Sequence, residues 1–228
     1  LVLKGQFAPN AVNVPFSLGE DADEIMPFAP VCELLGKLVV QLVDDPPESF
    51  DVEFEGAIAR HDTRVLSMAV LQGALADRVE GEISIVNVAN IAEERGLTVR
   101  ETKQPAAVDY LNLVTVTAQD GEAVTVAGTA LGVKHKPRIV QVWAQDVDLV
   151  PCRNMLFVRA KAQVPGTFGK IGAKMGEFGI NINQVSVGEA GDAAHEVMGL
   201  ALDAPISAEQ VAEALEAAGL VDARRVIL

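Results

Sequence analysis

The chain has 228 residues, of which 50% are hydrophobic and 4% aromatic, and its formal net charge is −14. This length allows one large or two ordinary domains, with cores built from Val, Leu, Ile and Ala rather than from aromatic residues. So negative a surface repels nucleic acid and anionic membranes, so neither is an expected partner. The cysteines, Cys32 and Cys152, form no disulfide framework, which favours a reducing, cytoplasmic location and a buried Cys32 thiol.

The first part of the chain predicts a linker followed by alternating helices and strands. Residues 1–20 contain Pro9 and Pro15 and show little periodicity, as is typical of an arm or linker. Apolar residues recur every three or four positions over 25–42 and again over 65–79, which predicts two amphipathic helices. Alternation over 49–59 predicts a strand between them.

The next segments predict mostly strands. An apolar run over 82–88 predicts a short strand, and Gly96 is placed to end the helix that follows it. Strands are expected over 97–102, 110–118 and 123–132, and Asp120-Gly121 predicts a hairpin turn between the last two. Two more short strands, joined near Asp146, complete a mixed α+β domain over 21–150.

The remaining residues, 151–228, predict a second domain with a clearer order. Strands are expected over 154–162, 182–189, 195–203 and 220–228, with helices over 166–178 and from 208 onward. The second helix begins at a capping box, Ser207 to Gln210. The order βαββαβ is the ferredoxin-like split pattern, with an antiparallel sheet and two helices on one face. The fold class expected for the whole chain is therefore α+β.

The sequence contains no pattern that indicates an active site. It has no G-x-G-x-x-G, and the segment from Gly166 to Lys170 departs from the phosphate-binding loop in spacing and in lacking Ser or Thr after the lysine. The three histidines are isolated from one another, so no metal site is expected. We expect this chain to hold no catalytic residue, no metal and no cofactor.

A small-ligand site is one interpretation of the glycine-rich segment. The N–H groups at a helix start near Gly166 suit a carboxylate, and the side-chain amides of Gln163 and Asn181 flank this helix. The alternative is that Gly169, Gly172 and Gly176 simply allow close packing along one helix face.

A second candidate site is a cluster of basic residues in an acidic chain. Lys134, His135, Lys136 and Arg138 lie within five residues and suit a phosphorylated or carboxylated metabolite. The alternative is a solvated basic turn.

The whole chain resembles one family in the order of its segments. "GQFAPNAVNVP" resembles the end of the catalytic part of long-form bacterial D-3-phosphoglycerate dehydrogenases. "EGAIARHDTRVLSMAVLQGAL" and "VNVANIAEERGLTV" resemble their intervening domain, and "QVPGTFGKIGAKMGEFGINI" resembles the first turn and helix of an ACT domain. The chain thus resembles the regulatory part of that family without its catalytic part.

The resemblance implies the following function. The family oxidises D-3-phosphoglycerate to 3-phosphohydroxypyruvate with NAD in domains that precede the region present here. The intervening domain binds an anionic effector, the ACT domain binds L-serine between subunits, and the enzyme is a tetramer. This chain would therefore be inactive by itself and would form a homo-oligomer.

The resemblance also assigns the amino-acid site residue by residue. Asn181 matches the family's asparagine, whereas Gln163 stands where Asp or Asn is usual and Lys161 where His or Tyr is usual. Val164 replaces a frequent arginine. These departures leave open L-serine, a related amino acid, or a purely structural tetramerisation module. A regulatory part of an iron–sulfur L-serine dehydratase is disfavoured because two separated cysteines cannot ligate the cluster.

Overall fold

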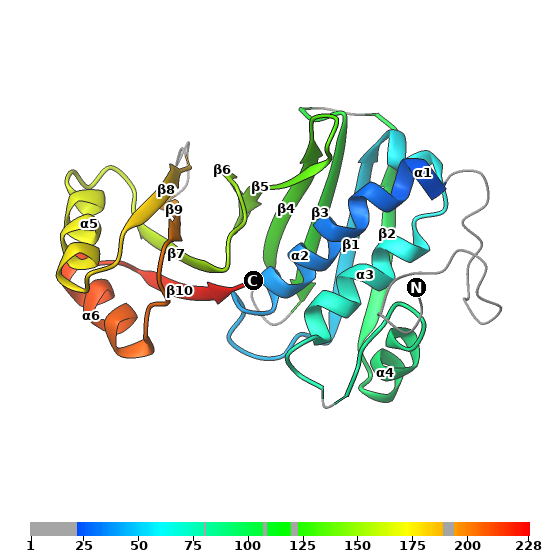
Figure 1. Cartoon of the computed structure of the whole chain (residues 1–228), viewed down its shortest axis with the longest axis horizontal. Coiled ribbons are helices and arrows are strands. Elements are labelled where there is room, and N and C mark those ends of the chain that lie inside the picture. The colour runs from blue at the N-terminus through cyan, green and yellow to red at the C-terminus, as the bar shows by residue number, and fades with distance from the viewer. Residues whose placement is uncertain (1–21, 80, 107–108, 120–122, 189–193) are drawn as a thin grey trace. The chain divides into compact units, whose positions relative to one another are not determined.

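The computed structural model describes residues 22–79, 81–106, 109–119, 123–188 and 194–228 (Figure 1). These residues form two compact units that divide between Pro137 and Arg138. The predicted arm over 1–20 and the predicted turn at Asp120-Gly121 lie outside the described residues. No helix in the described ranges is long and apolar enough to cross a membrane.

The chain alternates helices and strands through the first unit and repeats a simpler pattern in the second. The elements of the first unit are α1 (Ala22–Ile25), the 3-10 helix η3 (Met26–Phe28), α2 (Ala29–Val39), β1 (Ser49–Gly56), the 3-10 helix η4 (Ala57–Arg60), α3 (Arg64–Leu75), α4 (Val88–Glu94), β2 (Thr98–Gln104), β3 (Asn112–Gln119) and β4 (Val124–Leu131). Then follow β5 (Lys136–Val142), β6 (Gln145–Leu149), β7 (Asn154–Lys161), α5 (Thr167–Glu177), β8 (Ile182–Val187), β9 (His195–Leu202), α6 (Ala208–Ala218) and β10 (Asp222–Ile227).

The first unit is a sheet covered on one face by helices. Its strands lie in the order β2-β1-β3-β4, and β1 pairs in parallel with β2 and antiparallel with β3. Alternate residues of β1 point into the core, among them Phe50, Val52 and Phe54, none more than 1% exposed. Figure 1 shows α2 and α3 side by side across one face of this sheet. The mixed α+β class predicted from the sequence is confirmed.

Two glycines bring α2 and α3 into backbone contact. A Cβ added at Gly36 would overlap the carbonyl oxygen of Val70, and one added at Gly73 would overlap the carbonyl oxygen of Glu33. Both glycines are buried in the middle of their helices. Only a residue without a side chain fits at either point, so the two glycines fix how closely the helices pack.

The strand predicted over 82–88 is wrong. The side-chain oxygen of Asn87 accepts a hydrogen bond from the Ser84 backbone N–H at 2.8 Å, and its amide donates to the Glu82 carbonyl at 2.9 Å. These local bonds form a turn that leads directly into α4. An asparagine side chain that satisfies nearby backbone groups competes with strand pairing, which the apolar pattern alone does not reveal. The helix predicted over 25–42 is divided into α1, η3 and α2.

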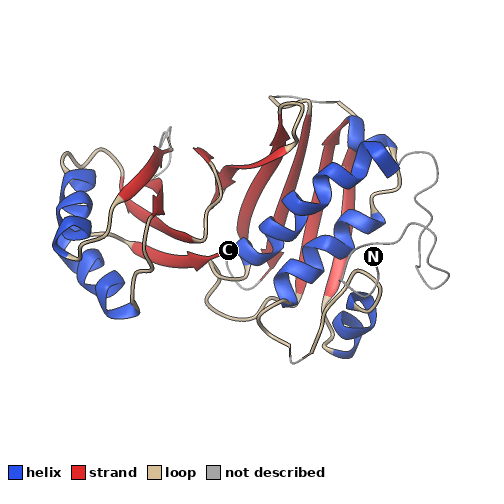
Figure 2. Ribbon diagram, in the orientation of Figure 1, coloured by secondary structure: helices blue, strands red, loops and turns tan. Residues whose placement is uncertain are grey.

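The second unit contains the ferredoxin-like arrangement predicted from the sequence. Its antiparallel sheet has the order β10-β7-β9-β8, and Figure 2 shows α5 and α6 together on one face. Leu156, Leu200, Ile171 and Met175 meet between the sheet and the helices, each at most 1% exposed. The predicted capping box is present, since the Gln210 N–H donates to Ser207 Oγ and Ser207 N–H donates to Gln210 Oε1.

Strand β6 packs on β9 at the sheet face that carries no helix. A Cβ added at Gly199 would overlap the side chain of Leu149, which is fully buried. The Gln145 side chain ties the two strands together: its Nε2 donates to the His195 carbonyl at 2.8 Å, and its Oε1 accepts from the Val197 N–H at 3.1 Å. These contacts explain why β6 belongs to the second compact unit although the sequence places the domain boundary after Val150.

The two cysteines differ in accessibility, which leads to a test of the first core. Cys32 is 0% exposed in α2, and burial raises the pKa of its thiol far above the ordinary value. The thiolate that reacts with disulfide reagents is therefore suppressed at Cys32. We expect a colorimetric thiol assay at pH 8 to find Cys152 alone reactive in the folded chain, and both cysteines after denaturation. Fast reaction of both thiols without denaturant, with Cys152→Ser as control, would contradict this packing.

Candidate functional site

Three of the predicted site residues meet at the N-terminal end of α5. Lys161 is the last residue of β7 and lies opposite His195 of β9. Gln163 follows in the left-handed region at φ 61°, and Gly166 begins the helix at φ 87°. All three are exposed. A non-glycine residue at positive φ is uncommon and indicates a locally constrained backbone.

The backbone at this end offers hydrogen-bond donors that no side chain caps. The N-cap position of α5 has no side-chain hydrogen bond to the helix, because the Thr167 hydroxyl turns back to the Val164 carbonyl at 3.0 Å. The Gln163 backbone N–H donates to the Glu196 carboxylate at 3.0 Å, which holds the turn in place. Together with the ammonium of Lys161, the first N–H groups of α5 suit a carboxylate.

Asn181 lies at the opposite end of α5 and has a partner that the sequence did not indicate. Its backbone N–H donates to Asp203 Oδ1 at 2.8 Å, and its side-chain Nδ2 donates to Asp203 Oδ2 at 2.6 Å. These hydrogen bonds lower the pKa of the Asp203 carboxyl, which is therefore ionised at neutral pH. Because the amide nitrogen is occupied, Asn181 presents its Oδ1 acceptor beside a negative charge, an arrangement that suits an ammonium group.

The structure therefore does not bring Asn181 and Gln163 together within one chain. They are separated by the length of α5, whose 11 residues span about 16 Å. A single amino acid is shorter than this helix and cannot contact both residues of the same copy.

The glycines of α5 do not serve close packing within the chain. A Cβ added at Gly169, Gly172 or Gly176 would meet no atom within 4 Å. These positions lie on a solvent-facing part of the helix next to Phe168, whose side chain is 42% exposed. Among the described residues, no contact offsets the cost of these glycines, which reaches about 1 kcal/mol each relative to alanine.

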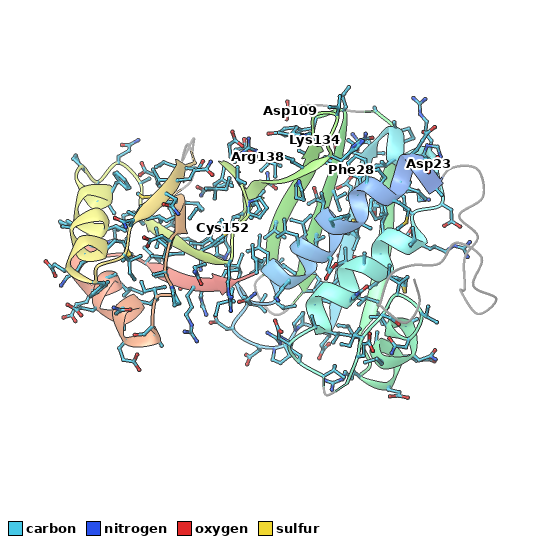
Figure 3. The ribbon with its side chains drawn as sticks, in the orientation of Figure 1. Asp23, Phe28, Asp109, Lys134, Arg138 and Cys152 are labelled. Carbon is cyan, nitrogen blue, oxygen red and sulfur yellow. The ribbon has the colours of Figure 1, made fainter. Side chains whose placement is uncertain are left out.

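The basic cluster is an exposed turn followed by an ion-paired arginine. Lys134, His135 and Lys136 are exposed, and His135 has φ 48°. Arg138 stands on β5 (Figure 3) and its Nε donates to Asp148 Oδ1 at 3.1 Å. An anion at Arg138 would have to displace this carboxylate.

His135 also lines a cavity of about 590 Å³ in the first unit. Asp23 and Glu24 line the same cavity, and Glu24 Oε2 lies 3.1 Å from His61 Nε2. Carboxylates at the wall oppose an anionic ligand. In the part of the chain that the structure describes, no three His, Cys, Asp or Glu side chains gather closely enough to hold a metal ion. The predicted anion site at 134–138 stays a prediction.

Comparison with known families now accounts for both units. The family model of the D-3-phosphoglycerate dehydrogenase intervening domain matches residues 24–143, which is more than half of the chain. The chain belongs to the D-3-phosphoglycerate dehydrogenase family. The ACT domain model matches residues 154–220. The intervening and ACT domains thus follow each other in the order that the sequence resemblance implied, while the predicted boundary after Val150 stays a prediction because residues 144–153 lie between the two matches.

Curated relatives agree with this assignment. The chain is 34% identical to a D-3-phosphoglycerate dehydrogenase of Mycobacterium leprae over 83% of its own length and 36% of the relative's. It is 31% identical to one of Synechocystis over its whole length and 41% of the relative's, and 28% identical to one of Methanocaldococcus jannaschii over 97% and 42%. The chain therefore spans about two fifths of the length of these D-3-phosphoglycerate dehydrogenases.

The assignment places the two ends of α5 in the ACT domain. The amino-acid site implied for an ACT domain involves Lys161, Gln163 and Gly166 at one end and Asn181 at the other. Asp203 and Glu196 were not predicted, because their partners in the structure lie 22 and 33 residues away in sequence. An acidic residue at a strand end carries no sequence signal for such a distant partner.

Proposed function

We propose that this chain is the effector-binding and oligomerising region of a D-3-phosphoglycerate dehydrogenase, and that a small L-amino acid, L-serine or a close relative, binds between two copies of its ACT domain. The observation that carries this proposal is the separation of complementary polar groups at the two ends of α5. One end offers N–H donors and Lys161, and the other offers the Asn181 carbonyl and the Asp203 carboxylate.

Charge complementarity sets the orientation of the amino acid. Its carboxylate would lie at the start of α5, near Gly166 and Lys161, where helix N–H groups and a cation favour an anion. Its ammonium would contact Asn181 Oδ1 and Asp203 of the second copy. In this orientation Lys161 attracts the carboxylate of the ligand and stands away from its ammonium.

The surface of α5 supports the approach of a second copy. Val164 and Phe168 are 47% and 42% exposed at its N-terminal end, and the open glycines offer no side chain that would hold another backbone away. Apolar side chains that are this exposed beside a groove of backbone favour burial in an interface.

The parent enzyme is proposed from the family. We propose that domains outside this sequence oxidise D-3-phosphoglycerate to 3-phosphohydroxypyruvate with NAD in the cytoplasm, and that the amino acid regulates them. The alternative, a purely structural tetramerisation module, has the same fold but no ligand between its ACT domains.

Calorimetry with the 228-residue chain tests the amino-acid site. L-Serine, L-alanine and glycine are titrated separately, and at least one is expected to bind saturably. Asn181→Ala is expected to weaken that binding at least tenfold, because it removes a hydrogen bond to a charged group, an interaction of about 1.5–3 kcal/mol.

Asn183→Ala is the matched control, since this exposed asparagine lies two residues away on β8. It is expected to change affinity less than twofold. An oligomer that binds none of the three amino acids would refute the effector proposal and favour the structural module.

A further inference from the structure

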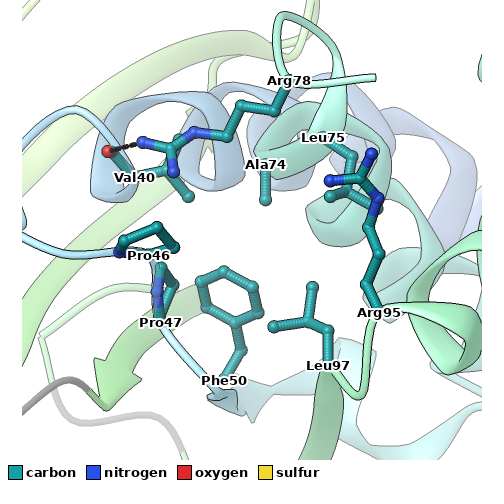
Figure 4. Close-up of a pocket in the computed structure, with 9 residues that line it drawn as sticks. All are labelled: Val40, Pro46, Pro47, Phe50, Ala74, Leu75, Arg78, Arg95 and Leu97. Atoms are coloured by element: carbon teal, nitrogen blue, oxygen red, sulfur yellow. Dashed lines mark hydrogen bonds between the residues drawn. The ribbon is translucent and has the colours of Figure 1, made fainter. Parts of the chain in front are cut away.

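A second cavity lies in the first unit, far along the sequence from the basic turn and outside the ACT domain. Its volume is about 510 Å³, within the range of small-molecule pockets. It lies where the C-terminal ends of α2 and α3 meet the start of β1 and the loop between α4 and β2 (Figure 4). The residues that line it are Val40, Pro46, Pro47, Phe50, Ala74, Leu75, Arg78, Arg95 and Leu97.

The walls of this cavity are apolar and firmly held. Figure 4 shows the Phe50 ring and Leu97 on one side and Ala74 with Leu75 opposite them. Phe50 is 1% exposed and belongs to β1, which is paired on both sides by β2 and β3. The two prolines restrict the backbone of a third wall. Such a slot favours a flat or branched hydrocarbon body and leaves hydroxyl groups of a ligand without partners.

The polar part of the cavity consists of two arginines. Arg78 Nη2 donates to the Val40 carbonyl at 2.6 Å, so the C-terminal end of α2 fixes this guanidinium and its other N–H groups remain available. Arg95 is exposed, and its side chain has no hydrogen bond or ion pair with any described residue. The nearby carboxylate of Asp77 is engaged with Lys37 at 3.1 Å. Two cations therefore border the cavity without a carboxylate partner among the described residues.

We propose that this cavity binds a small monocarboxylate with an apolar body, an aromatic or branched aliphatic acid. The body lies between Phe50 and Leu97 on one side and Ala74 and Leu75 on the other, and the carboxylate accepts hydrogen bonds from Arg78 and Arg95. Planar guanidinium groups match the geometry of a carboxylate. The apolar walls select against phosphorylated sugars and against serine, so this site is distinct from the amino-acid site proposed above and does not rest on it.

The test uses 3-phenylpropanoate as the probe and calorimetry with the full 228-residue chain. Saturable binding is expected for 3-phenylpropanoate, with at least tenfold weaker binding for 3-phenylpropan-1-ol, which has the same body without the charge, and for acetate, which has the charge without the body. Binding of acetate or inorganic phosphate as tight as that of the probe would overturn the proposal, because the apolar walls would then contribute nothing.

Arg95→Gln is the deciding variant, because the Arg95 side chain makes no contact that the fold needs. It is expected to weaken binding of 3-phenylpropanoate about tenfold. Arg60→Gln, a matched change of an exposed arginine in η4 that does not line the cavity, is expected to leave affinity within twofold. Equal affinity in the wild type and in Arg95→Gln would overturn the assignment, as would amide shifts by NMR that bypass Phe50 and Leu97.

Discussion

Replacing Gly73 by alanine is expected to destabilise the first unit by about 2–3 kcal/mol. Alanine normally gains up to about 1 kcal/mol over glycine inside a helix, so the sign of the effect is itself informative. Here the new Cβ overlaps the Glu33 carbonyl oxygen in α2, which is backbone and cannot turn aside. The helices must separate, and the apolar surfaces of both lose contact with each other. Gly36→Ala, which overlaps the Val70 carbonyl oxygen in α3, is expected to act in the same direction.

Urea unfolding followed by circular dichroism measures this effect. Gln72→Ala, a change at the adjacent and partly exposed position of α3, is the control and is expected to alter stability by less than about 0.5 kcal/mol. A Gly73→Ala variant that is as stable as the wild type would show that α2 and α3 do not pack at the distance described.

Replacing Leu149 by alanine is expected to destabilise the ACT unit by about 2–5 kcal/mol, because the side chain is fully buried against β9. Gly199→Ala is expected to destabilise it by about 1–3 kcal/mol for the opposite reason, since the added methyl group overlaps the Leu149 and Phe157 side chains.

The double variant tests whether the two residues contact each other. Truncation of Leu149 makes room for the methyl group at position 199, so the combined loss is expected to be smaller than the sum of the single losses by about 0.5–3 kcal/mol. The contact with Phe157 remains and keeps the rescue partial. Unfolding curves for the four proteins give this coupling directly, and strict additivity would place Leu149 elsewhere than over β9.

The sequence predicted the ACT unit better than the intervening unit for physical reasons. In the ACT unit each strand and helix is short, periodic and bounded by a turn, and the capping box at Ser207 marks a helix start by itself. Over 82–88 the apolar residues resembled a strand, whereas a single asparagine side chain at position 87 decides for a turn. Periodicity reports burial and does not report such local hydrogen bonds.

The candidate sites were predicted as residue types and not as constellations. Lys161, Gln163 and Gly166 are neighbours in sequence, so their common place at one end of α5 followed from the chain order. The Asp203 partner of Asn181 and the pairing of Arg138 with Asp148 required the strand registers. The glycine pair at positions 36 and 73 was invisible, because a glycine in a helical pattern does not indicate which neighbour comes close.

The length of α5 has a consequence for how effector affinity would be measured. With its two halves on different copies, the amino-acid site exists only in the assembled protein, and a closed two-fold pair holds two equivalent sites. Dilution that separates the copies would lower the apparent affinity, and saturating amino acid would in turn oppose dissociation. Two laboratories working at different protein concentrations would therefore obtain different dissociation constants for the same molecule.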